Sequence, residues 1–280
     1  FERLLYNKIV LEDEDQASQF LQCYRLRQTH MEPVPSTTAM YLADGIQSTT
    51  IIDILALCRG ITNLSLVSKD DDEHDDLTPL HHVLDDLPLT VLSLHIGATL
   101  TNTSVINFTM FARLTHLEIN DTDMLHDVDM DTFPRLTHLA LWPMLYNPTM
   151  NIPRSLRRLL KHATLQVLLL RVERHHECAT WLVRHAIDDP RIIIGPPEIE
   201  QWDDFGHGSM ALWELADERA NMPGPNHSST LVKRLSDYMD IDASPELAVD
   251  REIVSCFIAG ESGDASVRRG WCYNETSDDE

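Results

Sequence analysis

Five short stretches of this chain share one aliphatic pattern, and they recur at intervals of 22 to 29 residues. Each stretch is six residues long, and its first, fourth and sixth positions are aliphatic. A pattern that returns every 20 to 30 residues is typical of leucine-rich-repeat solenoids, in which each unit supplies one parallel strand and one helix or turn. The stretches are Ile61–Leu66, Leu89–Leu94, Leu114–Ile119, Leu136–Leu141 and Leu165–Leu170.

The segments between these stretches predict short crossover helices, because apolar residues recur there at helical spacing. Two weaker units, centred on the strands Met40–Leu42 and Ile192–Ile194, raise the repeat count from five to as many as seven. Near the N-terminus a strand at Lys8–Leu11 and a helix at Gln16–Arg27 are expected. The predicted crossover helices are Thr49–Arg59, Leu80–Leu87, Val105–Arg113, Ser155–His162 and Glu177–Ile187.

The expected fold is therefore an α/β, right-handed leucine-rich-repeat solenoid, irregular, with about 5–7 repeats, helical caps and a partly disordered C-terminal tail. We expect the repeat domain with its N- and C-terminal capping helices to span residues 1–220, the last cap being a helix at Ser209–Ala220. A linker at 221–230, a short helical extension at 231–260 and a disordered acidic tail at 261–280 follow.

Charge and cysteine usage restrict the partners and the compartment. The net charge of −23 opposes binding to nucleic acid, and it favours a protein partner, a basic one in particular. Five scattered cysteines without a Cys-x-x-Cys pair indicate reduced thiols in the cytoplasm or nucleus. No apolar run is long enough for a membrane helix, no motif indicates a metal or another cofactor, and we expect a monomer.

With the repeats laid out, residues 1–220 resemble the leucine-rich-repeat region of F-box-like proteins from mushroom-forming (basidiomycete) fungi. The residues that carry the likeness are Leu4–Leu11, Met40–Asp44, Leu55–Leu66 and the paired Arg-Leu-Thr-His-Leu motifs at Arg113–Leu117 and Arg135–Leu139. In such families an N-terminal F-box docks the adaptor of a cullin-type ubiquitin ligase, and the repeats recruit the substrate. No F-box is recognisable in this chain, so the resemblance implies an adaptor contact only if an F-box lies upstream.

A binding surface is predicted on the concave face of the sheet. The three aliphatics of each unit point into the core, so strand alternation directs the residues between them outward. One outward column consists of Thr62, Thr90, Thr115, Thr137 and Gln166, and we expect this ladder of threonines to be structural. The neighbouring columns predict one contiguous exposed patch for protein binding, made of His95, His116, Glu118, Asn120, His138, Trp142 and Arg171.

The chain lacks the motifs that signal catalysis, namely a nucleophile elbow, a phosphate loop and a kinase signature, so we expect no enzymatic activity and name no catalytic residue. The stretch His175–Cys178 lacks the spacing of a metal site. Three hypotheses remain open. The first is the substrate-recognition repeats of an F-box-like ubiquitin-ligase subunit. The second is a stand-alone scaffold or adaptor that binds a basic partner, and the third is a hydrolase with catalytic groups at the sheet edge.

Overall fold

The computed structural model describes residues 7–29, 37–67, 78–95, 109–119, 130–142, 152–172 and 174–195, together with Trp213, Ala216 and Asp217. Contacts divide the chain into two units, Phe1–Leu235 and Ser236–Glu280, and every described residue belongs to the first. The predicted linker, helical extension and tail at 221–280 lie outside the described residues, as do residues 70–76, six of which are acidic.

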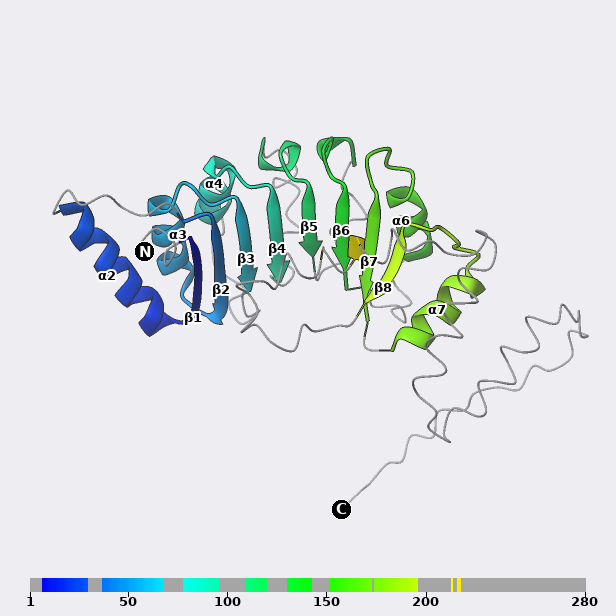
Figure 1. The fold of residues 1–280 in the computed structure, drawn as a ribbon, viewed down its shortest axis with the longest axis horizontal. Coiled ribbons are helices and arrows are strands. Elements are labelled where there is room, and N and C mark those ends of the chain that lie inside the picture. Colours follow the sequence, from blue (N-terminus) through cyan, green and yellow to red (C-terminus); the bar gives the residue numbers. More distant parts are fainter. Residues whose placement is uncertain are drawn as a thin grey trace, which may run out of the picture. The chain divides into compact units, whose positions relative to one another are not determined.

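The described part of the chain alternates strands with helices (Figure 1). Its strands are β1 (Lys8–Asp13), β2 (Ala39–Gly45), β3 (Asn63–Val67), β4 (Val91–His95), β5 (His116–Ile119), β6 (His138–Leu141), β7 (Val167–Arg171) and β8 (Ile192–Gly195). Its helices are α2 (Glu14–Thr29), α3 (Ser48–Leu57), α4 (Thr78–Asp86), α6 (Ile152–Leu159) and α7 (His175–Arg184), with 3-10 helices η3 (Thr109–Ala112) and η4 (Met130–Thr132).

The eight strands form one sheet in strict chain order, and every neighbouring pair is parallel. The register pairs the middle aliphatics of the five motifs directly with one another, so that they form one row across β3 to β7. Each member of the row is at most 1% exposed. The row consists of Leu64, Leu92, Leu117, Leu139 and Leu168. This topology and register define a leucine-rich-repeat-like α/β solenoid.

The main core lies between the sheet and the helices. It joins the motif aliphatics to helix residues such as Ile54, Leu84, Leu156 and Leu182. At the N-terminal end, α2 packs on β1 and α3, and the Tyr24 hydroxyl donates to the carbonyl of Leu57 at 3.2 Å. The weak units expected at Met40–Leu42 and Ile192–Ile194 are strands of the same sheet, β2 and β8.

One crossover differs from the sequence prediction. Of the helix expected at Val105–Arg113, the described residues form only the short η3. Asp85 at the end of α4 accepts a hydrogen bond from the Met110 backbone N–H at 2.7 Å and one from the Thr109 hydroxyl at 3.0 Å. These bonds hold the start of η3 against the end of α4. A short 3-10 turn needs fewer residues than a helix, which agrees with the close spacing of the units in the middle of the sheet.

The threonine column is structural, and hydrogen bonds give the reason. Each hydroxyl donates to the backbone carbonyl of the preceding threonine, at 3.2 Å from Thr90 to Thr62 and at 3.0 Å from Thr115 to Thr90 and from Thr137 to Thr115. The backbone N–H groups of the same residues donate to the same carbonyls. The ladder therefore satisfies the carbonyl groups just ahead of the strands and locks neighbouring repeats in register.

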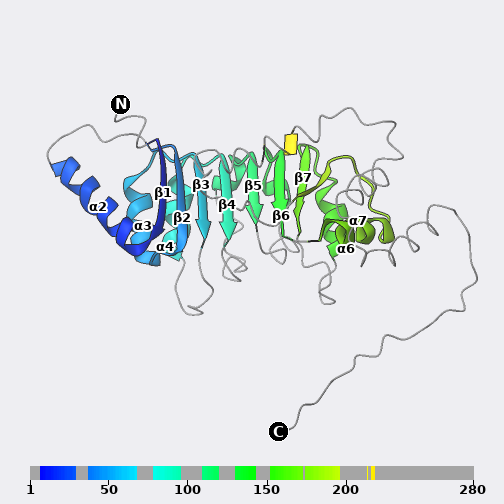
Figure 2. The same ribbon diagram turned by 60° about the horizontal axis from the view of Figure 1, so that its bottom comes forward.

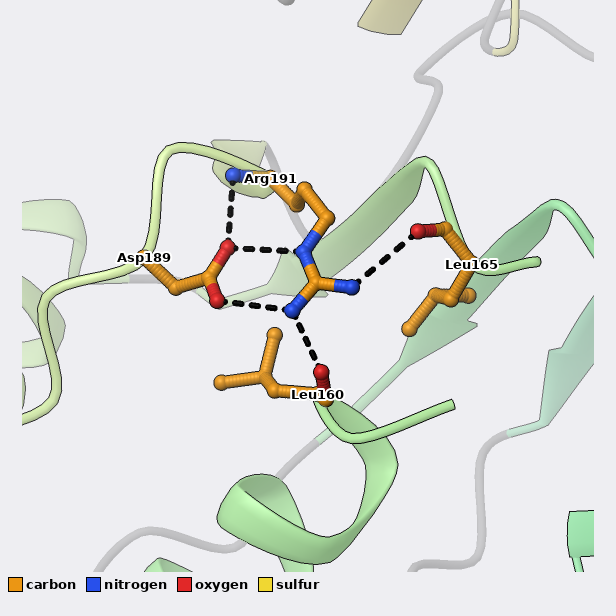
Figure 3. Close-up of polar contacts among 4 residues, drawn as sticks. All are labelled: Leu160, Leu165, Asp189 and Arg191. Carbon is orange, nitrogen blue, oxygen red and sulfur yellow. Dashed lines mark hydrogen bonds and ion pairs between the residues drawn. The ribbon is translucent and has the colours of Figure 1, made fainter. Parts of the chain in front are cut away.

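A second structural network ties β8 to the preceding repeat (Figure 3). The Arg191 guanidinium donates to both carboxylate oxygens of Asp189, at 2.9 and 2.8 Å, and to the carbonyl groups of Leu160 and Leu165. Hydrogen bonding from Arg191 lowers the pKa of Asp189, and the same pairing raises the pKa of Arg191. The hydrogen bonds of the Arg191 guanidinium therefore join the end of α6, the start of β7 and the start of β8.

Candidate functional site

The side of the sheet that faces away from the helices carries a second, separate cluster of side chains. We call this side the front face, defined by the residues that alternate with the core aliphatics. On β3 to β7 the register aligns two of its rows, Asn63, Val91, His116, His138 and Val167, and Ser65, Ser93, Glu118, Ala140 and Leu169. Residues from consecutive repeats thus stand side by side.

An ion pair is buried on the front face. Arg171 Nη1 of β7 donates to Glu118 Oε1 of β5, and the Ser93 hydroxyl of β4 donates to Glu118 Oε2 at 2.7 Å. The two charged side chains are only 3% and 7% exposed. Ala140, fully buried on the intervening strand β6, has no side chain beyond Cβ that could block the path between them. The Arg171 guanidinium carbon lies 4.6 Å from the ring centroid of Trp142, a cation–π distance.

Beside this pair two histidines stack on each other. His116 and His138 are direct partners in the register of β5 and β6, and their rings are 4.2 Å apart with an interplanar angle of 10°. Each ring is held by the threonine that precedes it, with Nδ1 to hydroxyl distances of 2.8 Å from His116 to Thr115 and from His138 to Thr137. Burial, and then the neighbouring His138, lower the pKa of His116 to about 4.

The histidine pair is covered by residues from far along the chain. Trp213 packs edge-on against both rings, with centroid distances of 5.3 Å to His116 and 5.7 Å to His138. Asp217 Oδ1 lies 2.8 Å from His138 Nε2. Both residues are helical, and a spacing of four places them on one helix face.

The covering residues complete an apolar cluster on the front face. Trp213 and Ala216 pack with Ala140, Val167, Leu169 and Ile193 in a cluster separate from the main core. Figure 2 shows the segment of these covering residues, drawn in yellow, next to β6 and β7. We expected the helix at Ser209–Ala220 to cover the open end of the stack, whereas its described residues also lie over the strands β5 to β7.

The structure brings most of the predicted patch together but corrects its exposure. His116, Glu118, His138, Trp142 and Arg171 are close neighbours on the front face. Glu118, His138 and Arg171 are buried, whereas the sequence analysis expected an exposed patch. Trp213 and Asp217 cover the histidines and so exclude water from them. Burial of Glu118 and Arg171 is tolerated because their opposite charges are paired. The side chain of His95, and all of Asn120, lie outside the described residues.

Three members of the site were missed by the sequence prediction. Ser93 was not among the predicted patch residues, and Trp213 and Asp217 were placed only in a terminal helix. One sequence signal for these two residues was available. An aromatic residue and a carboxylate lie four residues apart, and hence on one face of the predicted helix. It indicates a face that packs on something, but it does not say on what.

The contacts of the histidines argue against catalytic chemistry at this place. Thr137, His138 and Asp217 are connected like a hydroxyl, imidazole and carboxylate relay. The Thr137 hydroxyl, however, already donates to the carbonyl of Thr115 in the ladder, and His138 is buried. A hydroxyl nucleophile is activated by giving its proton to the adjacent base, whereas the Thr137 hydroxyl donates to a backbone carbonyl, so a structural role for this threonine accounts for its contacts.

Metal binding and membrane insertion find no support in the described residues. The two imidazole rings stack face to face, so their nitrogen atoms do not converge on one point as metal ligands must. Over the described ranges no three His, Cys, Asp or Glu side chains come together as a metal site. Among the helices that the structure describes, none has the length and apolar character needed to cross a membrane.

Comparison with known proteins adds one distant structural likeness. No protein-family model matches the chain, and no curated protein matches it in sequence. Its structure is similar to that of the leucine-rich repeat-containing protein LegL7 from Legionella pneumophila, with 16% sequence identity and a TM-score of 0.41. The match covers 70% of this chain and 67% of that one. The fold assignment rests on the order and register of the strands rather than on this likeness.

Proposed function

We propose that this chain is a protein-recognition module that binds its partner through the front face of the sheet. One observation carries the proposal. The parallel register gathers side chains from strands β4 to β7 into a single ordered cluster of a buried ion pair, stacked histidines and Trp142. His116 and Trp142 are only partly buried, so the buried ion pair beneath holds an aromatic surface rigidly in place, and rigid aromatic side chains are typical of interaction hot spots.

Solenoids with this topology offer a long, rigid surface, and that geometry suits an extended or helical partner better than a small molecule. Within this class we propose the finer role of substrate recognition in an F-box-like ubiquitin-ligase subunit, acting as a monomer in the cytoplasm or nucleus. Support for the finer role comes from the resemblance to fungal F-box-like repeats, including the paired Arg-Leu-Thr-His-Leu motifs. The adaptor of the ligase would bind an F-box upstream of the repeats.

A second candidate is a scaffold or adaptor without any link to a ligase. The observation that favours it is the net charge of −23, which attracts a basic partner over long distances whatever the chain's other contacts are. The two candidates share the front face as a binding surface, and they differ in whether ligase components accompany the partner.

Affinity purification of the full-length gene product, followed by mass spectrometry, tests both candidates. Val67→Arg places a long charged side chain on the front face, where Val67 is half-buried beside Tyr41 and Ala43. Val183→Arg is the matched control, because Val183 of α7 is exposed on a helix. We expect partners that are retained by Val183→Arg and lost with Val67→Arg.

Recovery of a cullin and its adaptor with those partners would support the ligase role. Partners without ligase components would favour the scaffold. If Val67→Arg retained every partner while Val183→Arg lost them, the front face would not be the binding surface, and the proposal would be wrong.

A further inference from the structure

The front face is already occupied in part by the chain itself. Trp213 packs edge-on against the stacked rings of His116 and His138, and Asp217 makes a hydrogen bond with His138. Ala216, between them on the same helix face, sits on an apolar floor formed by Ala140, Val167, Leu169 and Ile193. An aromatic ring, a small residue and a carboxylate, spaced over one helical turn, are thus matched by complementary groups of the sheet.

Hydrogen bonding gives this match a direction. The carboxylate of Asp217 can only accept, so His138 donates to it from Nε2–H. Nδ1 of the same ring lies 2.8 Å from the Thr137 hydroxyl, and this contact fixes the orientation of the imidazole. A hydrogen bond to an ionised carboxylate is charge-assisted and stronger than a neutral one.

The contact resembles a bound ligand more than a part of the core. Its apolar cluster is separate from the main core between sheet and helices, and of the described covering residues Trp213 and Ala216 belong to this cluster and not to the main core. The Asp217 side chain is half-exposed, at 49%, so solvent reaches the bond. The ladder bonds of Thr115 and Thr137 and the ion pair of Glu118 and Arg171 join residues of the sheet to one another, not to Trp213, Ala216 or Asp217.

We propose that the front face over β5 to β7 recognises a helical segment with an aromatic residue and a carboxylate four positions later, and that Trp213, Ala216 and Asp217 occupy this site in cis. The inference rests on the proposed function and names the chemistry of the partner. A partner helix of the same chemistry would displace the chain's own residues. The net charge of −23 repels strongly acidic proteins, which restricts the partner to a short motif with few carboxylates.

A peptide-binding experiment with the full chain tests the proposal. The opened variant, Trp213→Ala with Asp217→Ala, should bind a fluorescent peptide of residues 209–220. The wild-type chain should bind it at least about tenfold more weakly, because its site is filled and only the open fraction of molecules can bind. Adding His138→Gln to the opened variant should weaken binding by about tenfold or more, since the charge-assisted bond is lost.

Two controls separate recognition from a general effect. A peptide in which the tryptophan is replaced by alanine should not bind the opened variant. Adding His82→Gln, an exchange at an exposed histidine of α4, should leave binding unchanged. The single variant Asp217→Ala, which changes only a half-exposed side chain, should bind the peptide more tightly than wild type and less tightly than the opened variant.

The proposal is overturned if the variants keep their circular dichroism spectrum and melting temperature but bind the peptide no better than wild type. Unfolding of both variants would overturn it as well, because residues 213–217 would then be an integral part of the fold. The capture experiment with Val67→Arg does not depend on these residues. If the peptide-binding experiment failed while Val67→Arg still lost its partners in the affinity purification, only the helical motif would be refuted. The proposed function would then stand.

Discussion

The buried ion pair of Glu118 and Arg171 yields the sharpest prediction about stability. Glu118→Gln keeps the shape of the side chain and leaves an acceptor for the Ser93 hydroxyl, but it removes the charge that neutralises Arg171. The Arg171 side chain is 3% exposed, so water cannot replace the lost partner. Opposite charges about 4 Å apart interact by about 4 kcal/mol at an effective dielectric constant of 20. Breaking a buried pair on one side typically costs about 3–5 kcal/mol.

We therefore expect Glu118→Gln to lower the free energy of unfolding by about 3–5 kcal/mol, measured by urea denaturation followed by circular dichroism. The matched control is Asp53→Asn, because Asp53 pairs with Arg25 at 2.6 Å while both side chains are more than half exposed. That exchange should cost less than about 1 kcal/mol. Combining Glu118→Gln with Arg171→Met should recover part of the loss, since it also removes the buried positive charge. Equal small losses for Glu118→Gln and Asp53→Asn would refute the reasoning from burial.

Three further predictions concern other parts of the fold. Leu117→Asp puts a charge into a core position that is 1% exposed, and a loss of more than about 4 kcal/mol is expected in thermal melts; an unchanged melt would contradict the strand assignment. Arg191→Lys replaces the fork on Asp189 and two carbonyl groups by a single ammonium, and urea denaturation should register a loss of about 1–3 kcal/mol. For His116, a folded-state pKa of about 4 against the ordinary histidine pKa of about 6.5 means that the unfolded chain binds the extra proton, so this residue's contribution to stability falls as the pH falls from 6.5 to 4. His116→Gln should remove about 1–2 kcal/mol of that pH dependence after allowance for solvent screening, and an unchanged pH profile of the free energy of unfolding would contradict the burial of this ring.

Much of the fold follows from the sequence because burial has a local period. The aliphatics of each motif alternate with outward residues, and three buried side chains per unit fix which face of a strand is inside. Parallel stacking then aligns equivalent positions, so the pairing of His116 with His138 follows from the repeat itself. Even the weak units could be found, because Met40 and Ile192 continue the row of buried aliphatics.

The site itself depended on contacts between residues far apart in the chain. Glu118 and Arg171 are 53 residues apart, and His138 and Asp217 are 79 apart. Nothing in the local pattern around Glu118 distinguishes an exposed carboxylate from a buried, paired one. The threonine ladder was expected to be structural because β-branched residues suit strands, but its hydrogen bonds from hydroxyl to carbonyl depend on the exact spacing of neighbouring repeats.

Site-specific photocrosslinking tests most directly the central claim, that the front face binds a protein partner. A benzophenone amino acid would replace Val67 or Val91 on the front face in one set of full-length proteins and Val183 on α7 in another. After irradiation with the purified partner, the account predicts crosslinks from both front-face positions and none from position 183. Crosslinks confined to position 183 would contradict it and assign recognition to the helical side of the solenoid.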